Sequence, residues 1–135
     1  MSYSITPLLT GVRNPDQGIM TYQQGYGTPI WLPIWAFLLQ GGNKNVLVDT
    51  GLDENELMTP AGFSEETGLE PKSIVYCLAQ AGLKPDDIDV VITDLTMPQM
   101  SGLELAQKFQ RIRPDTPIIL CSGYVAQIPV EKAKS

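Results

Sequence analysis

The sequence predicts an α/β fold in which N-terminal antiparallel β-hairpins lead into a parallel βαβαβ core, arranged in three layers. Before about residue 45, Gly and Pro separate short segments rich in Thr, Tyr, Trp and Ile, a pattern typical of antiparallel strands. After that point, short runs of Val and Ile alternate with helical patterns. Such alternation indicates parallel strands joined by right-handed crossovers.

The composition is that of one compact globular domain spanning residues 1–135. The chain is 43% hydrophobic and 18% charged, and its net charge of −6 argues against nucleic acid or an anionic membrane surface as a partner. The longest apolar run, Ile30–Leu39, is too short to span a bilayer as a helix. Cys77 and Cys121 are expected to be small buried side chains in a reducing compartment, so we expect a cytoplasmic protein.

The N-terminal part is expected to form short strands at residues 4–12, 18–22 and 29–39. Trp31, Trp35 and Phe37 alternate along the last of these, and we interpret them as core residues rather than a ligand platform. If the run Ile30–Leu39 lacks covering elements, it would form an exposed apolar patch. Such a patch favours a protein partner or a homo-oligomer.

The C-terminal part should contain two helices between three buried strands. Pro71 suits the first position of one helix, which Gly82 ends. Ser101 and Glu104 have the spacing of a capping box that opens the second helix, and Pro114 ends it. A loop with a short helical turn is expected at 52–70. The strands are expected at 46–48, 90–92 and 117–121, and the second helix should bury a face formed by Leu105, Ala106, Phe109 and Ile112.

The chain contains no histidine. This removes the imidazole base of Ser-His-Asp and Cys-His triads, the commonest zinc ligand and any histidine phosphoacceptor. A zinc centre is therefore not expected.

Residues 3–93 resemble the N-terminal part of the metallo-β-lactamase superfamily, in particular its lactonase-like branch. The resemblance lies in the strand and turn Val-Leu-Val-Asp-Thr-Gly at 46–51, the helix end Ala-Gly-Leu-Lys-Pro at 81–85, and the run 86–93. In that family the last strand continues into the metal-binding His-x-His-x-Asp-His signature. Here it continues as Asp-Leu-Thr-Met-Pro-Gln at 94–99, so the resemblance implies the fold without the zinc centre.

Residues 90–135 resemble the middle of a response-regulator receiver domain. The match runs through Val-Ile-Thr-Asp-Leu-Thr-Met-Pro-Gln-Met-Ser-Gly at 91–102 and Pro-Ile-Ile-Leu-Cys-Ser-Gly-Tyr at 117–124. The two resemblances overlap at 90–93. The chain therefore reads as a chimera whose two parts share one buried strand.

The receiver resemblance implies a phosphoacceptor site. Asp94 would be the phosphoacceptor and a Mg²⁺ ligand, the carbonyl of Thr96 would add a second oxygen, and the Ser122 hydroxyl would bond the phosphoryl group. Mg²⁺ prefers several oxygen ligands, and Asp49 is the best further carboxylate because it also ends a parallel strand. Asp53 is a weaker third.

Lys132 is not placed at a strand end, so the receiver's phosphoryl-binding lysine is expected to be lacking. Asp49 and Ser122 also suit ordinary turns, and Asp94 suits a solvated strand end, which is the reading we favour. We therefore expect a hybrid protein without an intact catalytic site, in a binding or structural role. The alternatives are a Mg²⁺-dependent phosphoacceptor using Asp94 and, behind it, a residual hydrolase.

Overall fold

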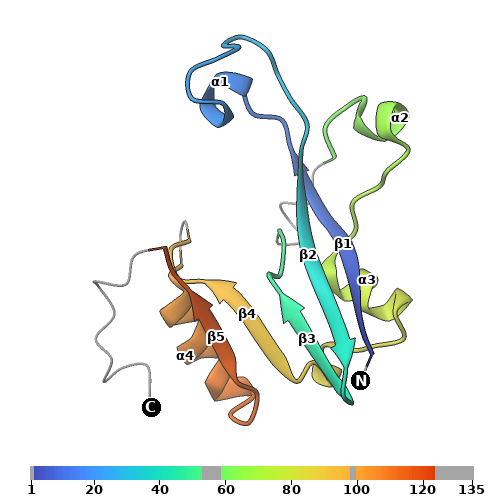
Figure 1. Ribbon diagram of the computed structural model, residues 1–135, viewed down its shortest axis with the longest axis vertical. Coiled ribbons are helices and arrows are strands. Elements are labelled where there is room, and N and C mark those ends of the chain that lie inside the picture. The colour runs from blue at the N-terminus through green and yellow to red at the C-terminus, as the bar shows by residue number, and fades with distance from the viewer. Residues whose placement is uncertain (1, 53–58, 98–99, 124–135) are drawn as a thin grey trace.

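The computed structural model describes residues 2–52, 59–97 and 100–123, which form a single five-stranded sheet with helices. The strands lie in the order in which they occur in the sequence (Figure 1). β1 (Tyr3–Arg13), β2 (Leu32–Gly41) and β3 (Lys44–Val48) are antiparallel, and β4 (Val90–Asp94) and β5 (Ile118–Cys121) continue parallel to β3. The predicted α/β class and the change from antiparallel to parallel strands are confirmed. Asp53, Lys132 and the rest of 124–135 lie outside the described residues.

Two different connections join the antiparallel strands. Gly42 and Asn43 link β2 to β3, and both have positive φ angles, of 59° and 62°, as a tight two-residue hairpin requires. The longer connection from β1 to β2 contains α1 (Gln17–Met20), where the sequence predicted a strand at 18–22. That prediction was wrong because Asp16 accepts a hydrogen bond from the Gly18 amide at 2.7 Å, which caps a helical turn.

Side-chain caps fix the starts of the two crossover helices. α3 (Ile74–Gln80) begins after Ser73, whose hydroxyl accepts from the Tyr76 amide at 3.2 Å, so the helix starts later than the predicted Pro71. α4 (Gly102–Ile112) begins at the predicted capping box, which is confirmed. There the Ser101 amide donates to Glu104 at 2.9 Å, and the Glu104 amide donates to Ser101 at 3.3 Å. The stretch before α3 contains α2 (Phe63–Thr67), the expected short helical turn.

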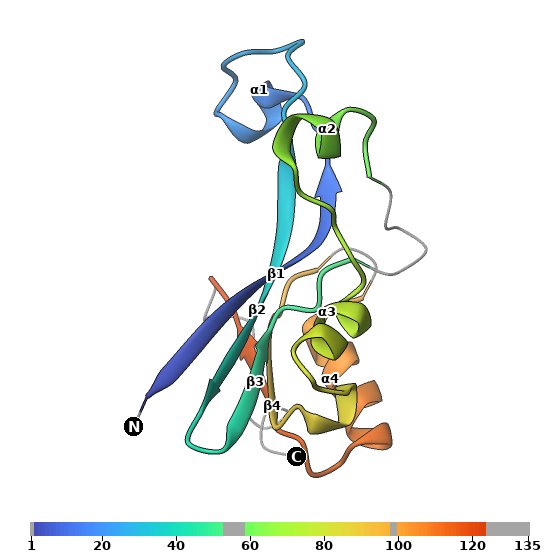
Figure 2. The ribbon, with the colours of Figure 1, turned by 90° about the vertical axis from the view of Figure 1, so that its right-hand side faces the viewer.

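The helices cover one face of the sheet. β3, β4 and β5 succeed one another in the same direction, so two right-handed crossovers place α3 and α4 on the same side. Figure 2 shows both helices on that side. Among the described residues these two helices thus form one layer, as expected for a strand order that does not reverse.

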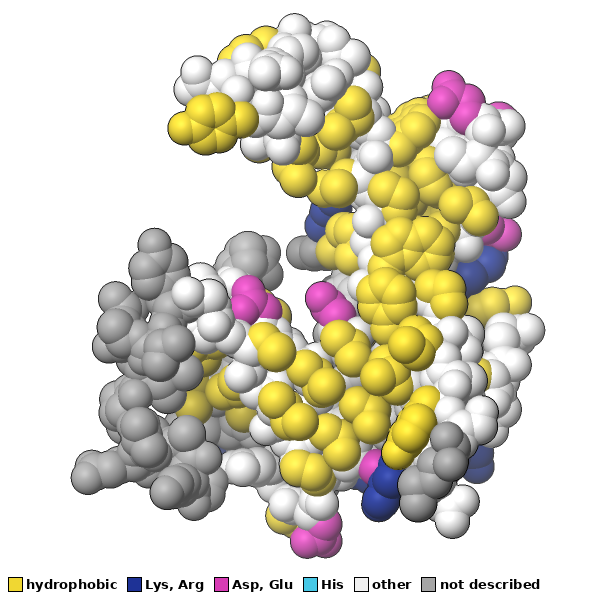
Figure 3. Space-filling model, in the orientation of Figure 1, with side chains coloured by type: hydrophobic (Ala, Val, Ile, Leu, Met, Phe, Trp, Pro, Cys, Tyr) yellow, Lys and Arg dark blue, Asp and Glu magenta, His cyan; other side chains and the backbone are white. Residues whose placement is uncertain are grey.

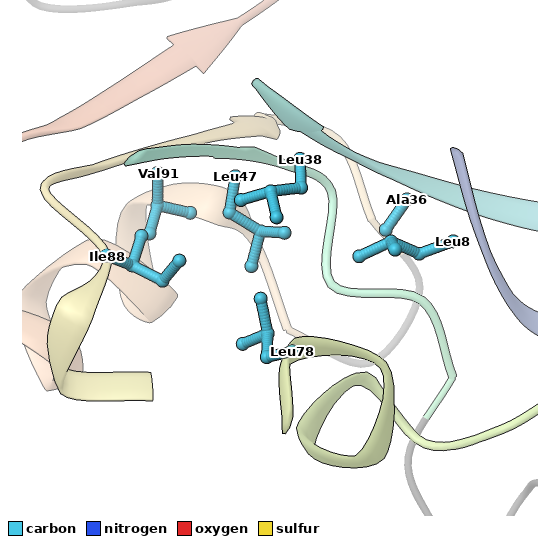
Figure 4. Close-up of a cluster of buried hydrophobic side chains, with 7 residues drawn as sticks. All are labelled: Leu8, Ala36, Leu38, Leu47, Leu78, Ile88 and Val91. Atoms are coloured by element: carbon cyan, nitrogen blue, oxygen red, sulfur yellow. The ribbon is translucent and has the colours of Figure 1, made fainter. Parts of the chain in front are cut away.

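The hydrophobic core lies between the sheet and these helices (Figure 4). Leu38, Leu47 and Val91 come from adjacent positions on three neighbouring strands, and their side chains share the helix-facing side. Leu78 of α3 packs onto them. The cluster of buried side chains comprises Leu8, Ala36, Leu38, Leu47, Leu78, Ile88 and Val91.

The C-terminal helix is less well buried than the sequence predicted. Gly102 is the buried residue of α4, and Phe109 is partly buried. Ile112, expected on the apolar face, is 80% exposed. Cys121, expected to be buried, is exposed, and Cys77 is half-buried. Among the described residues no helix is long and apolar enough to cross a membrane.

A polar cluster joins the β2–β3 hairpin to the segment before β4. Lys44 Nζ lies 2.6 Å from one oxygen of Asp89, and the Asn45 amide donates to the other at 2.8 Å. The hydrogen bond from Lys44, with that from Asn45, holds the pKa of the Asp89 carboxyl below its ordinary value. The cluster fixes the N-terminal ends of β3 and β4 side by side.

Candidate functional site

The predicted site residues lie at the carboxyl ends of three neighbouring parallel strands. Asp49 follows β3, Asp94 is the last residue of β4, and Ser122 follows β5. Val48 pairs with Ile92, and the Asp49 amide donates to the Ile92 carbonyl at 2.8 Å. β3 and β4 therefore lie side by side, which is the condition for Asp49 and Asp94 to open onto one crevice. Parallel neighbours end on the same edge of the sheet, where ligands of α/β folds bind.

Asp49 uses its carboxylate to hold its own turn. Its backbone has a φ of 64°, a left-handed conformation that Asp adopts more readily than most residues. One carboxylate oxygen accepts the amide of Thr50 at 2.6 Å and the amide of Gly51 at 3.0 Å. These are the bonds of an Asx turn. The geometry thus matches the turn interpretation of Asp49, and leaves its second oxygen for any ligand.

Asp94 lies at the exposed end of β4, where the backbone turns into α4. The amide of Leu95 donates to the carbonyl of Cys121 at 2.8 Å, and the amide of Gly102 donates to Leu95 at 2.9 Å. A Cβ atom at Gly102 would meet the backbone oxygen of Asp94, so only glycine allows this close approach. The packing fixes the backbone at Asp94 while its side chain remains in solvent.

The other two predicted site residues are Thr96 and Ser122. Thr96 is exposed, and Ser122 is half-buried and engaged in an interaction of its own. Within residues 2–52, 59–97 and 100–123, no group of three or more His, Cys, Asp and Glu side chains is placed to hold a metal ion. The available donors are carboxylate, carbonyl and hydroxyl oxygens, which suit Mg²⁺ rather than zinc.

A cavity of about 200 Å³ lies between α3 and α4, above the sheet. Ile74 and Leu78 of α3 line one side, and Leu105 and Phe109 of α4 line the other. Its walls are almost entirely apolar and offer no set of convergent polar groups. Sequence reasoning missed this cavity, because helical periodicity shows which residues face inward but not how closely two helices approach.

Apolar side chains also gather on the face of the sheet opposite the helices, which we call the open face (Figure 3). Figure 3 shows hydrophobic side chains gathered over the sheet on this side. Phe37 and Trp35 are 38% and 36% exposed there, so the prediction that they are core residues was wrong. Trp31 instead packs against Phe63, with ring centroids 5.7 Å apart. By strand register, the open face has Lys44 and Asp94 at opposite ends of its strands, and its apolar residues include Tyr3, Ile5, Pro7, Trp35, Phe37, Leu39, Val46, Val48, Val90, Ile92 and Ile119.

Two family models match the chain in overlapping ranges. The model of the metallo-beta-lactamase superfamily matches residues 29–96, and the model of the response regulator receiver domain matches residues 75–135. The two ranges share β4. This confirms the predicted two-part character of the chain.

The curated relatives match about a third of the chain. The chemotaxis protein CheY of Thermotoga maritima is 39% identical over 51 residues, covering 38% of this chain and 40% of that protein. The C4-dicarboxylate transport transcriptional regulatory protein DctD of Rhizobium meliloti is 46% identical over 46 residues, covering 34% of this chain and 10% of that protein. The chain thus spans less than half the length of these relatives.

Several of the similar solved structures are N-acyl homoserine lactone lactonases or hydrolases. A quorum-quenching N-acyl homoserine lactone lactonase superposes with a TM-score of 0.54 at 19% identity, covering 90% of this chain and 58% of that chain. A B. thuringiensis AiiA mutant with N-decanoyl-L-homoserine bound at its active site gives 0.55 at 19% identity, covering 93% and 62%. The likeness is one of fold, and it extends past the residues that match the metallo-beta-lactamase model.

The sheet topology, the lactonase-like fold and the family match over half of the sequence agree. The chain belongs to the metallo-beta-lactamase superfamily and ends in a receiver-like segment that begins within the same sheet.

Proposed function

We propose that this protein is a non-catalytic binding module and that the open face is its binding surface. The observation that carries the proposal is the composition of that face: its central rows contain only apolar residues, none of them is fully buried, and its charged residues Lys44 and Asp94 lie at the ends of the strands. Contiguous apolar surfaces of this kind mark interaction sites in folded proteins.

The residues at the polar edge of the sheet, where the parallel strands end, also support a non-catalytic role. Asp49 holds its own turn, and the sequence contains no histidine to act as a general base or zinc ligand. The lactonase-like fold therefore carries a different side-chain set from the one its family uses for metal. Binding through the apolar face requires none of these missing groups.

Fluorescence of an apolar dye such as anilinonaphthalene sulfonate, measured on dilute protein, tests the proposed surface. Phe37→Lys should remove most of the dye signal, because it places a charge in the middle of the open face. Ile112→Lys on α4 is the control, since Ile112 is exposed but lies off this face, and it should leave the signal unchanged. Equal signals from both variants, in folded protein, would overturn the proposal.

A second candidate function, phosphoacceptance at Asp94, is favoured by one observation. The receiver-domain model matches residues 75–135, which include Asp94, and this residue lies exposed at the end of β4, between two parallel neighbours. Receiver domains bind Mg²⁺, which would neutralise charge on the phosphoryl oxygens. Asp94, Asp49 and the Thr96 carbonyl would hold the ion, and Ser122 would bond the phosphoryl group.

In this reaction the Asp94 carboxylate would attack the phosphorus of a small phosphodonor while the bond to the donor's leaving group breaks. Incubation with Mg²⁺ and acetyl phosphate, read by intact mass, should then show one added phosphate. Asp94→Asn should abolish the adduct, and Asp115→Asn, at an exposed carboxylate away from this edge, should retain it. Folded wild-type protein that gains no mass would remove this candidate.

A further inference from the structure

We propose that the occupant of the open face is the open face of a second copy of this chain, packed sheet on sheet in a two-fold dimer. This inference rests on the proposed binding role and names the partner. It is argued from the area, the charge and the shape of the face.

The exposed area approaches what a stable dimer needs. Tyr3 and Ile5 are 69% and 65% exposed, Ile119 is 50% exposed, and Trp35 and Phe37 each expose more than a third of their surface. With about 150–250 Å² for a whole aromatic side chain, these five residues expose on the order of 500 Å². The partly exposed Leu, Val and Ile residues between them add to this. A standard interface buries about 800 Å² per partner, within reach of this face and its rim.

The charge distribution permits self-association. A chain of net charge −6 repels its own copy, so a self-complementary surface has to exclude the charged side chains. The central rows of the open face do so, because they contain only apolar residues. Lys44 and Asp94 are on the same face by register, but they lie at opposite ends of the strands, outside those rows. A partner of strongly opposite charge would find no complementary groups on this surface.

The distribution of side-chain size also favours a second copy. The large side chains Tyr3, Trp35 and Phe37 lie on β1 and β2, whereas Val46, Val48 and Val90 lie on β3 and β4. A two-fold axis running along the strands sets β1 of one copy over β5 of the other. The aromatic half of each copy then covers the aliphatic half of its partner, as in aligned sheet packing at about 10 Å.

Light scattering during size-exclusion chromatography of the full chain tests the inference. The wild-type mass should be twice the monomer's 14.8 kDa at high concentration. Ile119→Lys should raise the dimer dissociation constant by roughly 100-fold, because each copy would bury an unpaired charge. Ile112→Lys introduces the same change off the face and should leave the constant unaltered. Ile5→Lys, on the exposed edge strand β1, gives an independent second variant if Ile119→Lys does not fold.

The outcomes separate this inference from the proposed function. A dimer that Ile119→Lys or Ile5→Lys dissociates and Ile112→Lys does not supports a second copy as the occupant. A monomer at all concentrations whose open face still binds the apolar dye overturns the dimer and keeps the binding role, for a different partner. A dimer unaffected by every open-face variant overturns the inference, because its interface would lie elsewhere.

Discussion

The lactamase-like and receiver-like parts of this chain share β4 but contribute unequally to the core. The first part supplies β1, β2, β3 and α3, and with them most of the buried cluster, including Leu38, which is 0% exposed. The second part supplies α4 and β5, whose side chains on the sheet, such as Phe109 and Ile118, are only partly buried. The shared strand therefore makes the sheet continuous, but the side chains of the receiver-like part remain less buried than those of the lactamase-like part.

The cavity between α3 and α4 is a second sign that the two parts are not packed equally well. Each helix packs its apolar side chains onto the sheet, yet about 200 Å³ remains between the two helices. Strand pairing is set by backbone hydrogen bonds that every sequence can make, whereas the fit between two helices depends on matched side-chain shapes. Strands from two protein families can therefore be joined into one sheet more readily than their hydrophobic cores can be matched.

We expect the largest loss of stability from truncating a core side chain, and we expect this loss to differ between the two parts. Leu38→Ala should lower the free energy of unfolding by about 3–4 kcal/mol, because it leaves a cavity in the fully buried cluster. Phe109→Ala should cost about 1–2 kcal/mol, since its ring is only partly buried and already borders a cavity. Urea unfolding followed by circular dichroism measures both. Equal losses would mean that the receiver-like part is as tightly packed as the rest.

A substitution at the start of α4 probes the contact between that helix and β4. Gly102→Ala should destabilise by about 1–3 kcal/mol, because the added Cβ would collide with the backbone of Asp94 and Leu95. Without that collision, alanine near a helix start would be neutral or stabilising. Gly123→Ala is the control, since a Cβ there meets nothing within 4 Å. The same urea titration applies, and a stabilised Gly102→Ala protein would contradict the close approach.

Removing the side-chain caps of α4 and α3 should lower the stability by smaller amounts. Ser101→Ala removes the Ser101 hydroxyl, which accepts from the Glu104 amide and donates to the Glu104 carboxylate, and should cost about 1 kcal/mol. Ser73→Ala removes one cap bond from α3 and should cost somewhat less. Thermal unfolding monitored at a helical circular dichroism band measures the shift in Tm. A larger shift for Ser73→Ala would show that the second bond of the Ser101 hydroxyl, to the Glu104 carboxylate, adds nothing.

The smallest effect is a pH dependence at the Lys44–Asp89 cluster. The pKa of Asp89 is lower in the folded protein than in the unfolded chain, so the interaction contributes stability above the unfolded pKa. That contribution is lost as pH falls below about 4, through the folded pKa. Urea midpoints measured from pH 6 to pH 3 should fall more steeply for the wild type than for Asp89→Asn. Parallel curves would show that the cluster does not couple folding to protonation.

Local structure and the presence of parallel strands could be predicted from the sequence. The Ser101–Glu104 spacing predicts the cap of α4, and the Val-rich runs predict buried parallel strands with Asp49 and Asp94 at their ends, whereas the pairing of β3 with β4 was found in the structure. Such signals are local, because a cap needs residues three apart and a buried strand needs a short apolar run. The turn at α1 was missed because the Asp16 cap was not weighed against strand propensity.

Only the tertiary structure decided which surfaces are covered. The alternation of Trp35, Ala36 and Phe37 is the same whether the outer face of β2 packs against another layer or faces solvent. Burial of that face depends on the strand order, which places α3 and α4 together on the other side. The role of the Asp49 carboxylate likewise depends on the left-handed backbone at that position, which its sequence permits but does not impose. Sequence periodicity indicates which side chains share a face, whereas long-range packing decides whether that face is buried or exposed.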